Sequence, residues 1–130
     1  MKKLRMLWII PVLMVTGCMT GNVSKDGAIL KQYLEPAKLI ELTEKPRADI
    51  WIIDVRPSSD YAKGHIPTAK NFSSSEVMSR LDELPKSQYL IVYCETGIRA
   101  EIVISKLEKK GYTRMMNWGG YTRWPYELEK

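Results

Sequence analysis

Two short runs of apolar residues dominate the hydrophobic pattern of the chain. Residues 50–55 contain three Ile, one Trp and one Val, and residues 89–93 read Tyr-Leu-Ile-Val-Tyr. Neither run alternates between apolar and polar positions, as a strand with one face in water would. Short β-branched and aromatic runs of this kind are typical of central parallel strands that are covered on both faces. The pattern therefore predicts two buried strands of a parallel sheet.

Three other segments have apolar residues at helical spacing. One begins at Pro36, which suits the first turn of a helix, and the others cover residues 73–84 and 99–110. The predicted inward residues are Ala37, Leu39 and Ile40 in the first segment, Val77, Leu81 and Leu84 in the second, and Ala100, Val103 and Leu107 in the third. Because helices and strands alternate along the chain, we expect an α/β fold, with a central, mainly parallel sheet flanked by helices on both faces.

The first 17 residues have the pattern of an export signal. Three basic residues among the first five precede residues 6–16, which carry no charge. As a helix, that uncharged stretch covers roughly 16 Å, about half of a bilayer core of roughly 30 Å. This length suits a signal peptide better than a transmembrane span. An uncleaved signal anchor, in which Cys18 has no role, is the alternative.

Residues Val15-Thr16-Gly17-Cys18 place an apolar residue and two small residues before a cysteine, which resembles the lipobox of bacterial lipoproteins. The resemblance implies that residues 1–17 are removed as a signal peptide and that the Cys18 thiol is acylated. It also implies a lipid-anchored protein of the bacterial cell envelope, membrane-bound through Cys18 and facing the periplasm. Met19, where an Asp would favour the inner membrane of enteric bacteria, favours the outer membrane by analogy.

After Cys18 the chain changes composition. Residues 18–28 are mostly small and polar, and we expect them to form a flexible tether. Residues 29–130 have the composition of one globular domain, in a chain that is 45% hydrophobic and 27% charged overall. We expect this domain to be a monomer.

The charge balance does not favour a nucleic-acid partner. The net charge of +5 includes three basic residues in the signal, and the remaining 17 basic residues exceed the 15 acidic ones by two. One His and one free Cys cannot build a zinc site, and no glycine-rich dinucleotide fingerprint is present. We therefore expect neither a metal nor a dissociable cofactor.

Cys94 carries the most specific chemical signal in the sequence. It ends the second apolar run and is followed by a short loop with Gly97 and then by a predicted helix. Sites in parallel sheets form at the carboxyl ends of strands, where loop N–H groups and a helix N-terminus favour a thiolate. Arg99 adds a permanent positive charge that suits an anion. The pattern therefore predicts a nucleophilic cysteine beside an anion pocket.

Three blocks resemble a single rhodanese domain, of the sulfurtransferase family, over most of residues 33–127. The first is residues 53–71, with Asp-Val-Arg followed later by Gly-His-Ile-Pro. The second is the loop from Cys94 to Arg99, and the third runs from Gly111 through a Gly-Gly pair to a Trp. Asp60 and Thr68 depart mildly from the family pattern, where Glu and Gly are more usual. The resemblance implies a rhodanese-like α/β fold.

The length of the Cys94 loop favours sulfur transfer over phosphatase chemistry as the implied reaction. From Cys94 to Arg99 it has six residues, as in the sulfurtransferases of the family, whereas the related phosphatases have one more. The resemblance implies that Cys94 takes sulfane sulfur from a small anionic donor such as thiosulfate, holds it as a covalent persulfide, and passes it to a thiol or cyanide-like acceptor. The residues implied to bind substrate and persulfide are Glu95, Thr96, Gly97, Ile98 and Arg99.

Alternatives to this reading remain open at the level of sequence. The domain is alternatively a membrane-anchored sulfur carrier or protein-docking module without turnover of its own. A phosphatase or arsenate reductase is disfavoured by the loop length. His65, the only histidine, is more readily interpreted as a structural hydrogen-bonding residue than as a base, and Asp54 and Arg56 are expected to form an internal ion pair.

Overall fold

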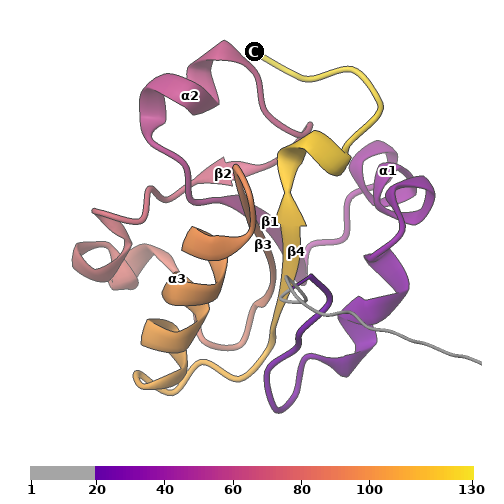
Figure 1. Ribbon diagram of the computed structural model, residues 1–130. Helices are drawn as coiled ribbons and strands as arrows, with labels where there is room; N and C mark the ends of the chain where they lie inside the picture. Colours follow the sequence, from indigo (N-terminus) through magenta and orange to yellow (C-terminus); the bar gives the residue numbers. More distant parts are fainter. Residues whose placement is uncertain (1–19) are drawn as a thin grey trace, which may run out of the picture.

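The computed structural model describes residues 20–130 (Figure 1). Four parallel strands form one sheet in the order β2-β1-β3-β4. The strands are β1 (Ile50–Asp54), β2 (Lys70–Asn71), β3 (Tyr89–Cys94) and β4 (Met115–Gly120). The α-helices are α1 (Pro36–Glu44), α2 (Ser58–Lys63) and α3 (Ile98–Glu108), and the 3₁₀ turns are η1 (Ala28–Tyr33), η2 (Val77–Ser79), η3 (Leu81–Glu83) and η4 (Tyr121–Arg123). This confirms the predicted α/β class and both predicted strands.

The sheet separates two hydrophobic clusters. Along β3, Leu90 and Val92 point to the face covered by α3, η2 and η3, whereas Ile91 and Tyr93 point to the face covered by α1 and η1. Figure 1 shows α3 and α1 on opposite sides of the strands. Because both faces are covered, the strands carry apolar residues at consecutive positions, which is the pattern seen in the sequence.

Helices α1 and α3 begin close to where the sequence predicts them. Pro36 occupies the first turn of α1, but the buried residues of this helix are Leu39 and Leu42. The prediction that Ala37 faces inward was wrong, because Ala37 is exposed. In α3 the predicted inward residues Ala100, Val103 and Leu107 are all buried.

Residues 73–84 do not form the predicted helix but two short 3₁₀ turns, η2 and η3. The start of the segment is held by the residue that follows β1, since the N–H of Ser74 donates to the Val55 carbonyl at 2.9 Å. Pro85 directly follows the segment and disfavours helical geometry in the residue before it. Of the predicted inward residues of this segment, Val77 and Leu84 are buried and Leu81 is partly buried against the same cluster, so the apolar spacing reflects packing without one continuous helix.

The segment 20–27, here called the N-terminal arm, pairs with β4. Val23 lies opposite Met116 in an antiparallel bridge. The arm exchanges backbone hydrogen bonds of 2.7–2.9 Å with residues 113–117. The structure therefore differs from the expected tether: the described part of residues 18–28 belongs to the folded domain. Small polar residues suffice there because the pairing uses backbone groups.

The predicted signal peptide and the lipidation site Cys18 fall within residues 1–19, outside the described part of the chain. Among residues 20–130, no helix is both long and apolar enough to cross a bilayer.

Candidate active site

Cys94 is the last residue of β3, and its side chain is fully buried. The loop that follows turns back so that the N–H of Gly97 donates a hydrogen bond to the Cys94 Sγ at 3.0 Å. This turn needs glycine, because Gly97 has a φ of 99°, in the left-handed region that side chains disfavour. Helix α3 begins at the next residue, so its N-terminus also points towards this loop.

The loop rests directly on β4, at the Gly-Gly pair of the sequence. A Cβ on Gly120 would lie closer than 3.0 Å to the carbonyl oxygen of Glu95. A Cβ on Gly97 would lie 3.2 Å from the Cα of Gly119. Glycines at these positions therefore allow the backbone of β4 and the backbone of the Cys94 loop to touch.

The other predicted loop residues lie on the surface. Glu95, Thr96, Ile98 and Arg99 are exposed, and the Thr96 hydroxyl accepts a hydrogen bond from the Ile98 N–H at 3.4 Å. The structure thus brings Cys94 and the Gly97 N–H together and leaves the side chains of the remaining loop residues at the rim.

Two hollows of about 110 Å³ each flank the loop. Arg99 lines the one on the α3 side, together with Ser74, Ile102, Val103 and Lys106. Glu95 lines the other, whose remaining lining residues are Arg56, Asp60, Lys63, Gly64, Tyr121 and Leu128. Within residues 20–130, no three His, Cys, Asp or Glu side chains are grouped as a metal site.

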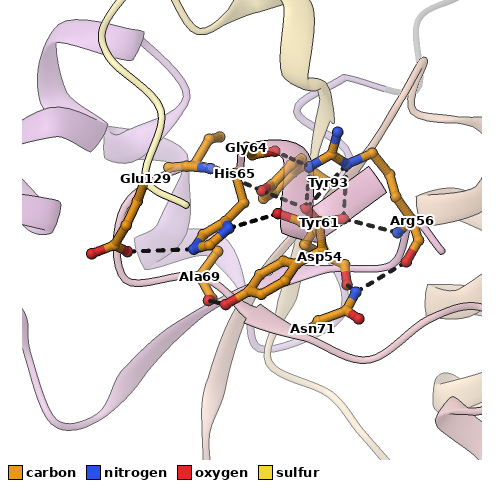
Figure 2. Close-up of polar contacts among 10 residues, drawn as sticks. Asp54, Arg56, Tyr61, Gly64, His65, Ala69, Asn71, Tyr93 and Glu129 are labelled. Carbon is orange, nitrogen blue, oxygen red and sulfur yellow. Dashed lines mark hydrogen bonds and ion pairs between the residues drawn. The ribbon is translucent and has the colours of Figure 1, made fainter. Parts of the chain in front are cut away.

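A buried ion pair lies at the carboxyl end of β1, next to Tyr93 of β3 (Figure 2). Arg56 and Asp54 form the ion pair expected from the sequence, with Nη2 and Oδ2 2.7 Å apart, and Arg56 also donates to the Gly64 carbonyl. The Tyr93 hydroxyl donates to Asp54 Oδ2 at 2.7 Å and accepts from the Ile66 N–H at 3.1 Å. Burial, and then the charge of Asp54, raise the pKa of Tyr93 well above its usual value.

His65 has the structural role favoured by the sequence. Its ring is stacked on Tyr61 with centroids 3.7 Å apart, and Nδ1 lies 2.9 Å from the Tyr61 carbonyl oxygen. Nε2 lies 3.4 Å from the Glu129 carboxylate. Figure 2 marks this contact between His65 and Glu129. These contacts join α2 to the C-terminal segment.

Asn117 is the site residue that the sequence reasoning missed. It is fully buried in β4, and its side chain donates to the Gly97 carbonyl at 3.0 Å. A polar residue between Met116 and Trp118, two positions before a Gly-Gly pair, was the available signal. A buried amide in an otherwise apolar strand needs hydrogen-bond partners, and here the Cys94 loop supplies one.

The fold and this cysteine loop define a class of protein. Residues 35–126 match the family described as rhodanese-like domain, so this chain belongs to the rhodanese-like family.

Relatives with sulfurtransferase names support this assignment. A sulfurtransferase of Allochromatium vinosum is 31% identical over 77 residues, which cover 58% of this chain and 72% of the relative. The thiosulfate sulfurtransferase GlpE of Coxiella burnetii is 31% identical over 93 residues, which cover 71% and 82%.

Solved structures of rhodanese-like proteins have a similar fold. A rhodanese-like domain protein from Staphylococcus aureus has a TM-score of 0.62 and 27% identity, covering 72% of this chain and 92% of that one. A structure described as rhodanese with anions, from E. coli, has a TM-score of 0.57 and 29% identity, covering 62% and 98%.

Proposed function

We propose that this protein is a sulfurtransferase that moves sulfane sulfur through a persulfide on Cys94. The observation that carries the proposal is the Gly97 N–H bonded to the Cys94 Sγ within a six-residue loop at the carboxyl end of β3. An N–H held at this distance stabilises negative charge on the sulfur. Relatives named sulfurtransferase and thiosulfate sulfurtransferase support the choice of reaction.

In the first half-reaction, the Cys94 thiolate attacks the outer sulfur of thiosulfate. A bond forms between Sγ and that sulfur while the sulfur–sulfur bond of the donor breaks, and its electron pair leaves with sulfite. The product is a Cys94 persulfide anion, which the loop N–H groups stabilise. Arg99, at the rim of the loop, attracts the dianionic donor.

In the second half-reaction, a nucleophile such as cyanide or a thiolate attacks the terminal sulfur of the persulfide. That sulfur leaves with the acceptor, the electron pair of the broken bond returns to Cys94 Sγ, and the thiolate is regenerated. Because the enzyme alternates between two covalent forms, ping-pong kinetics are expected.

We also propose that the chain is a lipoprotein of the bacterial envelope, anchored through acylated Cys18 with the domain on the periplasmic side. The lipobox-like residues 15–18 and the signal-like composition before them support this localisation.

A second candidate function is a sulfur carrier that needs a partner protein for turnover. One observation favours it: Ile98 and Ile102, one turn apart on α3 beside the loop, are 55% and 49% exposed. Exposed apolar residues next to a reactive cysteine suit contact with a protein acceptor.

The test is the intact mass of the full chain, purified in detergent, after thiosulfate treatment and again after a cyanide chase. We expect a gain of one sulfur atom that is lost on chasing and is absent from Cys94→Ala. A gain of sulfur in Cys94→Ala would contradict the mechanism. Persulfide formation without steady-state turnover on small acceptors would favour the carrier.

A further inference from the structure

Asn117 lies where β4 departs from regular pairing with β3. Val92 pairs with Asn117 but Tyr93 pairs with Gly119, so Trp118 is an extra residue on the β4 side. Bulges of this kind re-aim side chains and occur near active sites. Side chains alternate along a strand, and Met115 packs in the α3 cluster, so Asn117 also faces α3.

All hydrogen-bonding atoms of the Asn117 side chain have partners. Oδ1 accepts from the Gly119 N–H at 2.9 Å, across the bulge. Nδ2 donates to the Gly97 carbonyl at 3.0 Å and to Glu101 Oε1 at 3.1 Å. One side chain therefore joins the bulge of β4, the Cys94 loop and the first turn of α3.

We propose that Asn117 is a positioning residue for persulfide formation: by holding the Gly97 carbonyl, it directs the Gly97 N–H at the Cys94 sulfur. This rests on the proposed sulfurtransferase function. Glycine has the widest backbone freedom of any residue, so the position of its N–H must be fixed from outside. The Gly97 carbonyl accepts two hydrogen bonds, one from Asn117 and one from the Glu101 N–H at 3.0 Å.

The amide is specifically required at this position. A carboxylate has only acceptor oxygens, so Asp at residue 117 would keep the bond from the Gly119 N–H and lose both donations. It would also place negative charge against the Gly97 carbonyl oxygen and the Glu101 carboxylate. Asn117→Asp is therefore nearly isosteric but reverses the interaction that holds the loop.

The experiment measures single-turnover persulfide formation by intact mass over a range of thiosulfate concentrations, on the full chain in detergent. For Asn117→Asp and Asn117→Ala we expect the maximal rate to fall about tenfold or more, the order of effect of a displaced reacting group. The half-saturating thiosulfate concentration should stay within about twofold, because Asn117 is buried and does not meet the donor. A wild-type maximal rate in Asn117→Asp would overturn the proposal.

Asn71→Asp is the matched control. Asn71 Nδ2 also donates to two backbone carbonyls, those of Asp54 and Arg56, at 2.9 and 3.0 Å. We expect this variant to lose thermal stability as Asn117→Asp does while its maximal rate stays within about twofold of wild type. An equal loss of rate in both variants would assign the effect to general loosening and overturn the proposal.

Two further measurements apply if the Asn117 variants do not fold or if wild type forms no persulfide. If neither Asn117→Asp nor Asn117→Ala folds, Asn117→Ser takes their place, because its shorter side chain does not reach the Gly97 carbonyl, and an unchanged maximal rate in that variant overturns the proposal. If wild type forms no persulfide, the proposed function fails by itself. The rate of Cys94 alkylation by iodoacetamide then tests the role of Asn117. We expect this rate to differ at least threefold between Asn117→Asp and wild type, and equal rates would overturn the proposal.

Discussion

Tyr93 immediately precedes Cys94 and fixes the end of β3 from the opposite face of the sheet. Its hydroxyl both donates and accepts within the buried cluster of Asp54 and Ile66 (Figure 2). Removing one partner of a buried hydrogen bond leaves the other without water or protein to replace it. The residue therefore matters for stability rather than for chemistry.

Replacing Tyr93 by Phe is expected to lower the free energy of unfolding by about 1–3 kcal/mol, because the Ile66 N–H loses its acceptor. Urea denaturation measures the change. Tyr89→Phe is the control, since the Tyr89 hydroxyl makes no hydrogen bond to other residues within 20–130 and should cost less than about 0.5 kcal/mol. Equal losses in the two variants would contradict this role of Tyr93.

Alkaline pH should destabilise the protein through the same hydroxyl. Burial and the Asp54 charge raise the Tyr93 pKa, so the folded protein keeps a proton that the unfolded chain loses near pH 10. The stabilisation is complete below pH 10, and above it falls by up to about 1.4 kcal/mol per pH unit. Unfolding measured at pH 9, 10 and 11 should show a shallower decline in Tyr93→Phe than in wild type, and parallel declines would argue against this assignment.

Arg99 is exposed at the rim of the loop, where its charge meets donors in solution. We expect Arg99→Ala to raise the Michaelis constant for thiosulfate about three- to tenfold with a smaller change in kcat, because an exposed charge attracts the anion without holding the sulfur. Steady-state kinetics measure this, with Lys109→Ala as the control, since Lys109 is exposed at the opposite end of α3 from the Cys94 loop. An unchanged Michaelis constant would remove Arg99 from donor binding.

At the level of elements, β4 supports the site by close backbone contact. Gly120 meets the carbonyl of Glu95 in the Cys94 loop, and Gly27 of the N-terminal arm meets the carbonyl of Met115 in the same way. Both contacts leave no room for a Cβ, but only the first involves the loop.

Gly120 and Gly27 allow the effect on the loop to be separated from the effect on stability. Gly120→Ala and Gly27→Ala should each destabilise the protein, by about 1–3 kcal/mol as overpacked sites do. Only Gly120→Ala is expected to slow persulfide formation, because only there must the loop move. Thermal unfolding and single-turnover mass analysis separate the two effects. A comparable loss of rate in Gly27→Ala would show that the loop responds to stability in general.

The elements also show how far sequence reasoning reaches. The strands at 50–54 and 89–94 were predictable because both faces are covered and apolar residues, Asp54 apart, occupy consecutive positions. The predictions of a flexible tether at 18–28 and of a helix over 73–84 were wrong, because backbone hydrogen bonds to β4 and to Val55 decide these structures. Such bonds leave no mark in the pattern of apolar residues. Cys94 and its loop followed from the motif. A polar residue in an apolar strand marks Asn117 in the sequence, but its bonds to the loop depend on a bulge that the sequence does not reveal.

For the whole molecule, the lipid anchor is the feature to test. We expect Cys18→Ser to move the protein from the membrane fraction to the soluble fraction, because each buried acyl methylene contributes about 0.8 kcal/mol to membrane binding. Fractionation followed by immunoblotting measures this, with Cys94→Ser as the control that should stay membrane-bound. Continued sedimentation of Cys18→Ser with membranes would favour an uncleaved signal anchor.

The N-terminal arm sets how far the domain can stand from such a membrane. The backbone N–H of Gly21 donates a hydrogen bond to the backbone carbonyl of Asn117, and Thr20 packs against Gly119, beside the Cys94 loop. Only Met19 separates Thr20 from Cys18, so two peptide units, about 7 Å at full extension, span the gap. With Cys18 acylated as proposed, this short connection holds the domain against the lipid headgroups and restricts its rotation. Sulfur donors and acceptors would then reach Cys94 from the layer of solution next to the bilayer.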